Sequence, residues 1–282
     1  MSTGEWIITV QGPDRTGLVG AVGTAVADVG ANITHAEQHC DVASGMFVQR
    51  VVCETGGSGG DLADRMAEVG RSYGMRIEVH DARRRPPVVV AASAAGHVLG
   101  DLLLRWRSGE LPCEIVAVVS DVEDHEDLAR WAGVEYHWLP TEGLERVEHE
   151  RRLDGVLREV GAERVWLARY MRILTGWFTG RWEGQVVNIH HSFLPAFVGA
   201  GPYRQAHERG VKLIGATAHY VTEGLDEGPI IAQDSIAVGH LDTVQDLVRK
   251  GRDLEVAVMA RAVRADLLHQ VVVVGNRTVV FG

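Results

Sequence analysis

The sequence predicts an α/β protein of two domains, a ferredoxin-like βαββαβ domain followed by a sheet of mainly parallel strands. The first 80 residues give strand and helix signals in split βαβ order. Beyond residue 87, short apolar runs alternate with helical stretches, the pattern of parallel strands with crossover helices. At 282 residues the chain is long enough for two such domains.

The N-terminal elements follow from hydrophobic spacing and glycine turns. Apolar residues recur every three or four positions in the helices and run continuously or alternate in the strands. Gly45 and the glycine-rich run at 55–61 provide turns. We expect, in order, a strand over Trp6–Gln11, a helix over Asp14–Gly30, strands over Asn32–Cys40 and Met46–Cys53, a helix over Leu62–Ser72 and a strand over Met75–His80.

A charged, proline-containing segment, DARRRPP, separates the two halves. Pro86 and Pro87 cannot continue a helix, and charge runs are usually solvated, so we interpret the segment as a linker. The predicted organisation is an N-terminal domain over 1–81, a linker over 82–87 and a C-terminal domain over 88–282.

The C-terminal domain begins with short buried strands and ends differently. The expected elements are apolar strands around Val88–Val90, Ile115–Val119, Val165–Leu167 and Val186–Ile189, longer strands over Lys212–Val221 and Pro229–Val238, a helix over Thr243–Leu268 and a final hairpin that turns at Gly275–Asn276.

Composition excludes several classes of protein. A formal net charge of −10 argues against a nucleic-acid binder, whose affinity depends on neutralising phosphates. No apolar stretch reaches the length of a membrane span, and the N-terminus has no basic, signal-like region. Three cysteines without CxxC spacing indicate reduced thiols, so we expect a cytoplasmic protein without a membrane partner.

Polar residues gather in NIHHSFLP, directly after a predicted buried strand. Ligands of open α/β sheets bind beyond the carboxyl ends of the strands, so a site is expected here. Asn188 and His190, two residues apart, point to the same side of a strand and offer an amide donor and an acid–base group. His191 points to the other side, where a supporting role is favoured. A metal site that includes His219 is a weaker alternative because the ligand spacing is not typical.

Asp226 lies on a predicted loop between Gly224 and Gly228. Most loop carboxylates are simply solvated. Next to His190, however, a carboxylate would fix the imidazole's tautomer, so Asp226 is a candidate for catalysis.

These motifs resemble those of a known family. NIHHSFLP followed by LDEGPI resembles the formyltransferase fold that uses 10-formyltetrahydrofolate. The segments ARYMRIL and PYRQAHERGVKLIGATAHYVTEGLDEGPI look like formyltetrahydrofolate deformylase, a family that joins an ACT domain to a Rossmann-like formyltransferase-fold domain. In the first 80 residues, PDRTGLVGAV, GANIT and GMFVQRV resemble an ACT domain.

The resemblance implies hydrolysis of 10-formyltetrahydrofolate to tetrahydrofolate and formate, with no permanently bound cofactor and no metal. It assigns catalysis to Asn188, His190 and Asp226. It also implies a folate pocket, and the candidate residues for it are Met171, Arg172, Ile173, Leu174, Val221, Gly224 and Leu225.

Two alternatives stay open. One is a formyltransferase that acts on a small amine, since Asp121 stands where the family has Asn, Val98 where it has Cys, and His125 is displaced. Against it, the segment Ala91–Leu104 lacks the glycine-rich phosphate cradle of enzymes that formylate glycinamide ribonucleotide. The other alternative is a non-catalytic amino-acid sensor. His97 either faces the acceptor pocket or is a buried helix-start residue.

The ACT resemblance also implies regulation. Such domains pair with a second copy and bind a small amino acid, so a homo-oligomer with glycine or methionine as effector is expected. The candidate effector-binding residues are Asp14, Gly17 and Leu18, at a helix start with free N–H groups, and Asn32.

Overall fold

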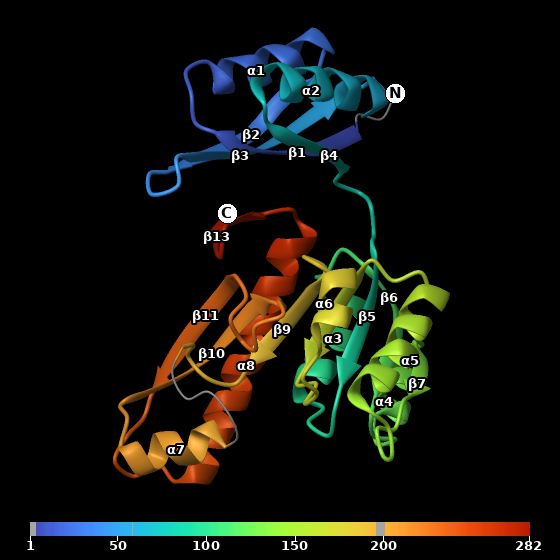
Figure 1. Ribbon diagram of the computed structural model, residues 1–282, viewed down its shortest axis with the longest axis vertical. Coiled ribbons are helices and arrows are strands. Elements are labelled where there is room, and N and C mark those ends of the chain that lie inside the picture. The colour runs from blue at the N-terminus through green and yellow to red at the C-terminus, as the bar shows by residue number, and fades with distance from the viewer. Residues whose placement is uncertain (1–3, 58, 196–200) are drawn as a thin grey trace. The chain divides into compact units, whose positions relative to one another are not determined.

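Figure 1 shows a computed structural model of the chain, which describes residues 4–57, 59–195 and 201–282. Contacts divide the chain into two compact units. The first runs to Arg84 and includes Leu268–Gly282, and the second is Arg85–Leu267. The predicted fold class is confirmed: the first unit has the ferredoxin-like arrangement, and the second has a Rossmann-like sheet flanked by helices.

The first unit is a four-stranded antiparallel sheet in the order β2-β3-β1-β4, with α1 and α2 on one face (Figure 1). Its core contains Ile8, Val22, Val51 and Leu62, all completely buried. Its elements are β1 (Gly4–Pro13), α1 (Leu18–Asp28), β2 (Asn32–Asp41), β3 (Met46–Thr55), α2 (Gly59–Tyr73) and β4 (Arg76–Asp81).

Helix α1 begins later than the hydrophobic spacing predicts. The sequence favours a start at Asp14, whereas the helix begins at Leu18. Gly17 immediately before it has a φ of 94°, a left-handed conformation that glycine adopts without strain. The turn at Gly17 thus delays the helix.

A C-terminal hairpin, β12 (Val271–Val274) and β13 (Arg277–Val280), also belongs to the first unit. Its apolar residues pack with Val48 of β3 in a cluster of Val48, Val272, Val274 and Phe281. The Arg50 guanidinium donates to the main-chain oxygens of Leu268 and His269. The sequence placed residues 268–282 with the C-terminal domain, and the contacts instead place them with the ACT-like sheet.

The second unit contains a seven-stranded mixed sheet in the order β11-β10-β9-β8-β5-β6-β7. Strands β9, β8, β5, β6 and β7 are parallel, and β10 pairs antiparallel with β9 on one side and with β11 on the other. Its elements are β5 (Pro87–Ala92), α3 (His97–Arg107), β6 (Glu114–Ser120), α4 (Glu126–Ala132), β7 (Glu135–Trp138), α5 (Arg146–Glu159), β8 (Arg164–Ala168), α6 (Gly176–Arg181), β9 (Val186–His190), α7 (Pro202–Arg209), β10 (Leu213–Tyr220), β11 (Ile230–Ala237) and α8 (Val244–Leu267).

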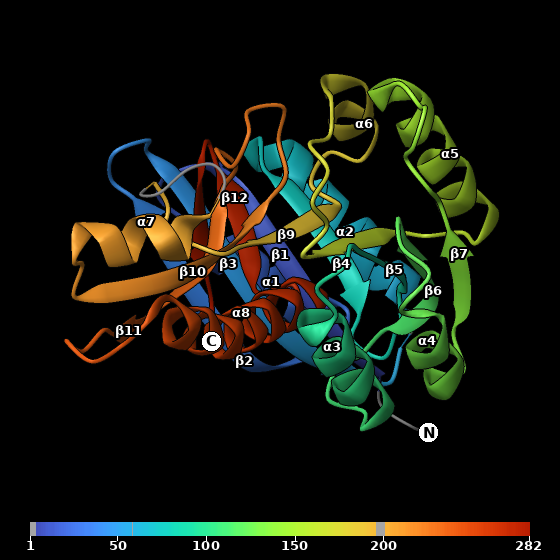
Figure 2. The same cartoon turned by 90° about the horizontal axis from the view of Figure 1, so that it is seen from below.

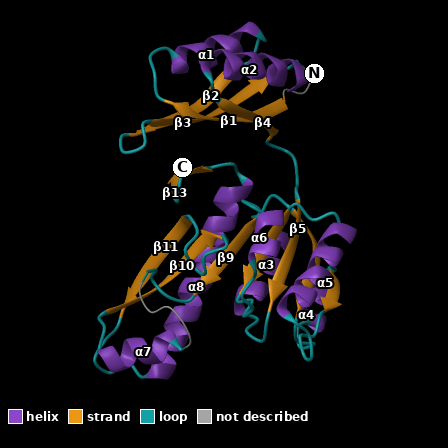
Figure 3. Cartoon of the chain, in the orientation of Figure 1, coloured by secondary structure: helices purple, strands orange, loops and turns teal. Residues whose placement is uncertain are grey.

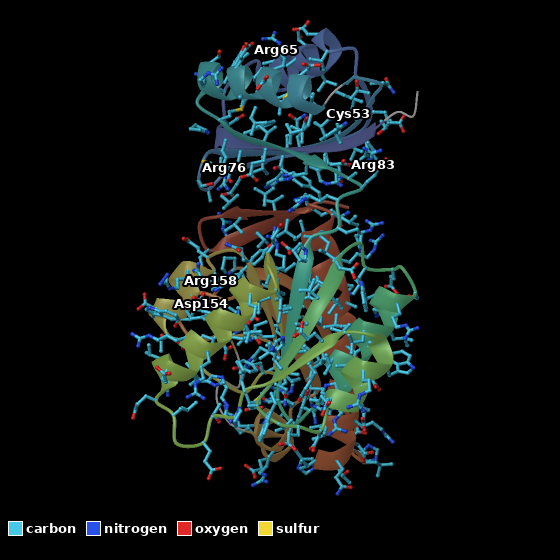
Figure 4. All side chains as sticks on the ribbon, turned by 90° about the vertical axis from the view of Figure 1, so that its right-hand side faces the viewer. Cys53, Arg65, Arg76, Arg83, Asp154 and Arg158 are labelled. Atoms are coloured by element: carbon cyan, nitrogen blue, oxygen red, sulfur yellow. The ribbon has the colours of Figure 1, made fainter. Side chains whose placement is uncertain are left out.

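Helices cover both faces of this sheet. Figure 2 shows α3, α4 and α8 on one face and α5 with α6 on the other, and Figure 3 shows the same layers by element type. Helix α5 is tied to α6 by Asp154, labelled in Figure 4, which accepts from the Trp182 indole at 3.0 Å and from its helix neighbour Arg158 at 2.9 Å.

The strand order places the polar loops together. The chain builds β5, β6 and β7 outward and then returns to add β8 and β9 on the other side of β5. Ligands of such sheets bind at the carboxyl ends of the strands where this reversal occurs. The loops after β5 and β8 and the end of β9 meet there.

Candidate active site

The site is built on the paired strands β9 and β10. Asn188 and His190 lie on β9, and His219 lies opposite Asn188 in the antiparallel register with β10. The His219 Nδ1–H donates to the main-chain oxygen of Tyr220 at 2.9 Å, which leaves Nε2 as an acceptor. The Asn188 Nδ2 donates to this Nε2 at 3.2 Å, so His219 orients the Asn188 amide.

Asp226 reaches the same place from the loop between β10 and β11. Its φ of 55° is left-handed, which is uncommon for a residue other than glycine. Its Oδ2 lies 3.2 Å from Nδ1 of His190, and its Oδ1 lies 3.6 Å from Nε2 of His219. The structure therefore brings together the three residues that the sequence singled out, Asn188, His190 and Asp226, and adds His219 to them.

Burial and charge give the cluster its character. His190 is 7% exposed, and its Nε2 is buried without a hydrogen-bond partner among the residues that the structure describes. Burial would raise the pKa of Asp226, but the hydrogen bond and charge of His190 lower that pKa well below its ordinary range. Asp226 is therefore an anion at neutral pH, next to an imidazole with one unpartnered nitrogen.

His191, the next residue along the chain, lies near both His190 and Tyr203. Its ring lies 5.1 Å from that of His190 and 6.0 Å from that of Tyr203, centroid to centroid. Burial, reinforced by the charge of Arg169, lowers the pKa of His191 to about 4. His191 is therefore neutral at physiological pH.

The segment proposed for pterin binding follows β8 and is partly open. Met171 and Ile173 are exposed, and the half-exposed Arg172 forms an ion pair with Asp121 at 2.6 Å. The Met171 N–H donates to the Ser93 hydroxyl at 3.0 Å. Leu174 instead packs into the hydrophobic core, so its side chain is directed away from any ligand in this segment.

The candidate folate residues on the loop between β10 and β11 are also divided between buried and exposed positions. Val221 packs on the core, and its N–H donates to the main-chain oxygen of Val186 at 2.9 Å. Leu225 is exposed, and Gly224 is half-buried. Of the three candidate folate residues on this loop, Leu225 is therefore the one whose side chain is available for contact.

The residues that depart from the family pattern lie beside the same strand ends. The displaced His125 is buried and its Nε2 bonds the main-chain oxygen of Ser93 at 2.7 Å, so it supports the loop after β5. Asp121 accepts from Arg172 through Oδ2, while its Oδ1 is buried and has no partner within residues 4–57, 59–195 and 201–282.

The candidate effector residues lie in the first unit. Asp14 is exposed, and its N–H donates to the main-chain oxygen of Gly45. Gly17 caps α1, which has no side-chain cap and no acidic residue in its first turn. Leu18 is buried, and Asn32 is exposed at the start of β2.

None of the helices in the described part of the chain combines the length and the apolar character needed to cross a membrane. Within residues 4–57, 59–195 and 201–282, no group of three or more His, Cys, Asp or Glu residues has the arrangement of a metal site.

Comparison with known proteins gives consistent matches to both units. Residues 87–263 match the formyl transferase family, and residues 6–61 match the ACT domain family. A protein of Synechocystis named formyltetrahydrofolate deformylase is 43% identical over 97% of each chain. The crystal structure of a formyltetrahydrofolate deformylase from Pseudomonas syringae pv. tomato is similar with a TM-score of 0.96 and 40% identity, covering 99% of this chain and 94% of that one.

The match to transferases is confined to part of the chain. A glycinamide ribonucleotide transformylase from Symbiobacterium toebii is 35% identical with a TM-score of 0.67, covering 70% of this chain and 95% of that one. The likeness to these transferases is thus shorter and weaker than the likeness to the deformylases.

Proposed function

The chain belongs to the formyltetrahydrofolate deformylase family, and from this membership we infer that it hydrolyses 10-formyltetrahydrofolate to tetrahydrofolate and formate. It is a hydrolase that cleaves a carbon–nitrogen amide bond. The observation that carries the site assignment is Nε2 of His190, which is buried and has no hydrogen-bond partner in the described part of the chain, next to Asn188 and the ionised Asp226.

The geometry supports a direct attack by water. The water oxygen bonds to the formyl carbon as Asp226 takes up one of the water protons, and negative charge develops on the formyl oxygen. The bond from carbon to N10 then breaks, N10 receives that proton, and formate leaves while the second water proton passes to solvent. In this proposal the oxyanion accepts from Asn188 Nδ2 and from Nε2–H of His190 in its imidazolium form, which donates from both nitrogens and so keeps its Nδ1–H on Asp226. Donors placed where charge develops are worth about 3–4 kcal/mol each.

His219 has a positioning role in this proposal. Its Nε2 accepts from the Asn188 amide, and its Nδ1–H is held by the main chain of Tyr220. With the tautomer fixed in this way, one N–H of Asn188 is committed to His219 and the second is directed to the substrate.

We assign folate contacts to the open residues of the two loops. Met171, Arg172 and Ile173 present exposed side chains, and Leu225 is exposed on the other loop. Leu174, Val221 and Gly224 contribute through their main chains, which offer the donors and acceptors that a pterin ring needs.

The direct test is product analysis with purified protein and 10-formyltetrahydrofolate. We expect formate and tetrahydrofolate in equal amounts without an added amine. Release that waits for an amine would instead establish a transferase, and no turnover at all would support a sensor.

The remaining assignments concern regulation and location. We propose that a small amino acid binds near Asp14, Gly17, Leu18 and Asn32, where the N–H groups that begin α1 are uncapped.

We also propose a homo-oligomer assembled through the first unit, because β2 is an edge strand whose side chains are mostly exposed. A cytoplasmic location fits the free thiols of the three cysteines.

A further inference from the structure

A second polar cluster lies beside the proposed catalytic residues and is centred on Glu255 of α8. The Glu255 side chain is 1% exposed. It accepts from Nε2 of His97 at 2.8 Å and from the Tyr203 hydroxyl at 2.5 Å, and Nε of Arg169 lies 3.4 Å away. Four segments of the second unit therefore meet on one buried carboxylate.

This cluster adjoins the reaction site. Leu167 of β8 lies level with Asn188 of β9 in the parallel register, so Arg169, two residues further on, leaves the sheet beside His190. The backbone of Arg169 has a φ of 62°, a left-handed conformation that turns the chain at this point. The ring of His191 links the two clusters, since it lies between His190 and Tyr203.

The charges of the cluster are fixed. Burial would raise the pKa of Glu255, but the His97 hydrogen bond and the Arg169 charge lower it, so Glu255 is ionised. An arginine is permanently protonated. The positive charge of Arg169 acts on His191, whose pKa it helps to lower.

Arg169 also has an unmet hydrogen-bond requirement. Its Nη1 is buried without a partner in the part of the chain that the structure describes. A buried N–H without an acceptor is costly, and a water oxygen can satisfy it. An ammonium group has only donors, so next to Arg169 it would place one N–H donor opposite another and one positive charge opposite another.

We propose that Arg169, positioned by Glu255, makes water the formyl acceptor by excluding amines from this side of the site. This inference rests on the proposed hydrolysis. The two reactions differ only in the attacking atom: the oxygen of water or the nitrogen of an amine bonds to the formyl carbon as the carbon–N10 bond breaks. An attacking amine uses its single lone pair in the bond to carbon and cannot also accept from Arg169, whereas water attacks with one lone pair and accepts from Arg169 with the other.

The test measures how product divides between two acceptors rather than the rate. The protein is supplied with 10-formyltetrahydrofolate and increasing glycinamide at pH 7, and formate and N-formylglycinamide are quantified against an enzyme-free blank. The native protein should give formate almost alone. In Arg169→Ala, the ratio of N-formylglycinamide to formate should rise roughly tenfold or more, a typical size for discrimination by one contact.

Two further variants separate charge from folding. Arg169→Lys keeps the cation and should keep formate as the product, while Glu255→Gln keeps the volume, loosens Arg169 and should raise the ratio by a smaller amount. Arg209→Ala, at an exposed site on α7, is the matched control with an unchanged ratio.

The ratio can be read from residual turnover, so a loss of rate does not obscure it. The inference is overturned if both Arg169→Ala and Glu255→Gln form only formate at saturating glycinamide, or if Arg169→Lys behaves like Arg169→Ala. A native protein that needs glycinamide to release formate would overturn the proposed hydrolysis itself, which is a different outcome.

Discussion

At the level of single residues, the ionised Asp226 beside His190 is the feature on which the proposed chemistry depends. The carboxylate holds Nδ1 of His190 and so directs Nε2 toward the substrate. Asp226→Asn keeps the shape but removes the charge, and we expect kcat to fall by about a hundredfold to a thousandfold, the loss typical of one oxyanion donor.

Folding should be unaffected by this change, which thermal unfolding followed by circular dichroism would verify. Asp253→Asn, at an exposed site on α8, is the matched control and should keep full activity. If Asp226→Asn turns over at a near-native rate, Asp226 has no part in the mechanism.

The lowered pKa of His191 predicts how the stability of the protein depends on pH. Its folded pKa of about 4 lies below its ordinary value of 6.5. Between these values the unfolded chain binds a proton at His191 that the folded chain does not. The contribution of the neutral His191 to the free energy of unfolding is therefore complete above pH 6.5 and is lost as the pH falls toward 4. At pH 4.5 the loss amounts to about 2 kcal/mol.

Replacing His191 with Gln removes this titration. The difference in unfolding free energy between pH 7 and pH 4.5, measured with urea, should shrink by about 2 kcal/mol relative to the native protein. The exposed His207→Gln should leave the difference unchanged. An equal acid sensitivity in native protein and His191→Gln would show that His191 is not held neutral by the fold.

Sequence reasoning found some members of the site and missed others. Asn188 and His190 could be identified because strand alternation alone places them on one side. His219 could be placed only by the register of β10 against β9, which no local pattern encodes. Arg169 and Glu255 are 86 positions apart in the chain and meet only because α8 packs under the strand ends.

At the level of elements, hydrophobic periodicity predicted the strands and the long helix because burial of one face determines both. It could not predict where a short apolar hairpin docks. The run Val271–Val274 is apolar at every position and carries no indication of its partner. Its place on β3 is determined by long-range contacts with Val48 and Arg50.

This docking predicts a selective effect of Phe281→Ala. Phe281 is 6% exposed within the hairpin cluster, and a buried Phe replaced by Ala costs about 3–5 kcal/mol. Amide hydrogen exchange should accelerate in β12, β13 and the first unit, while β5, β8 and β9 stay protected. Val280→Ala, at a half-exposed position, should have little effect. Equal acceleration in both units would contradict the assignment of the hairpin to the first unit.

At the level of the whole molecule, the two units suit a division between regulation and catalysis. The proposed catalytic residues all lie within Arg85–Leu267, and the candidate effector residues all lie in the other unit. An effector then acts only through a difference in its affinity between active and inactive assemblies, typically worth about 1–3 kcal/mol.

We therefore expect glycine or methionine to bind the full-length protein and to change its kcat or KM by about 5–150-fold, the range that this coupling allows. Calorimetry would measure binding, and sedimentation velocity with and without the amino acid would measure assembly. Asn32→Ala should abolish the response and leave basal turnover unchanged, since Asn32 is exposed on β2 and far in sequence from the proposed catalytic residues. The exposed Glu54→Ala on the neighbouring strand serves as its control. A monomer whose kinetics respond to no proteinogenic amino acid would leave the ACT-like unit without a regulatory role, because neither an interface nor a coupled ligand would then exist.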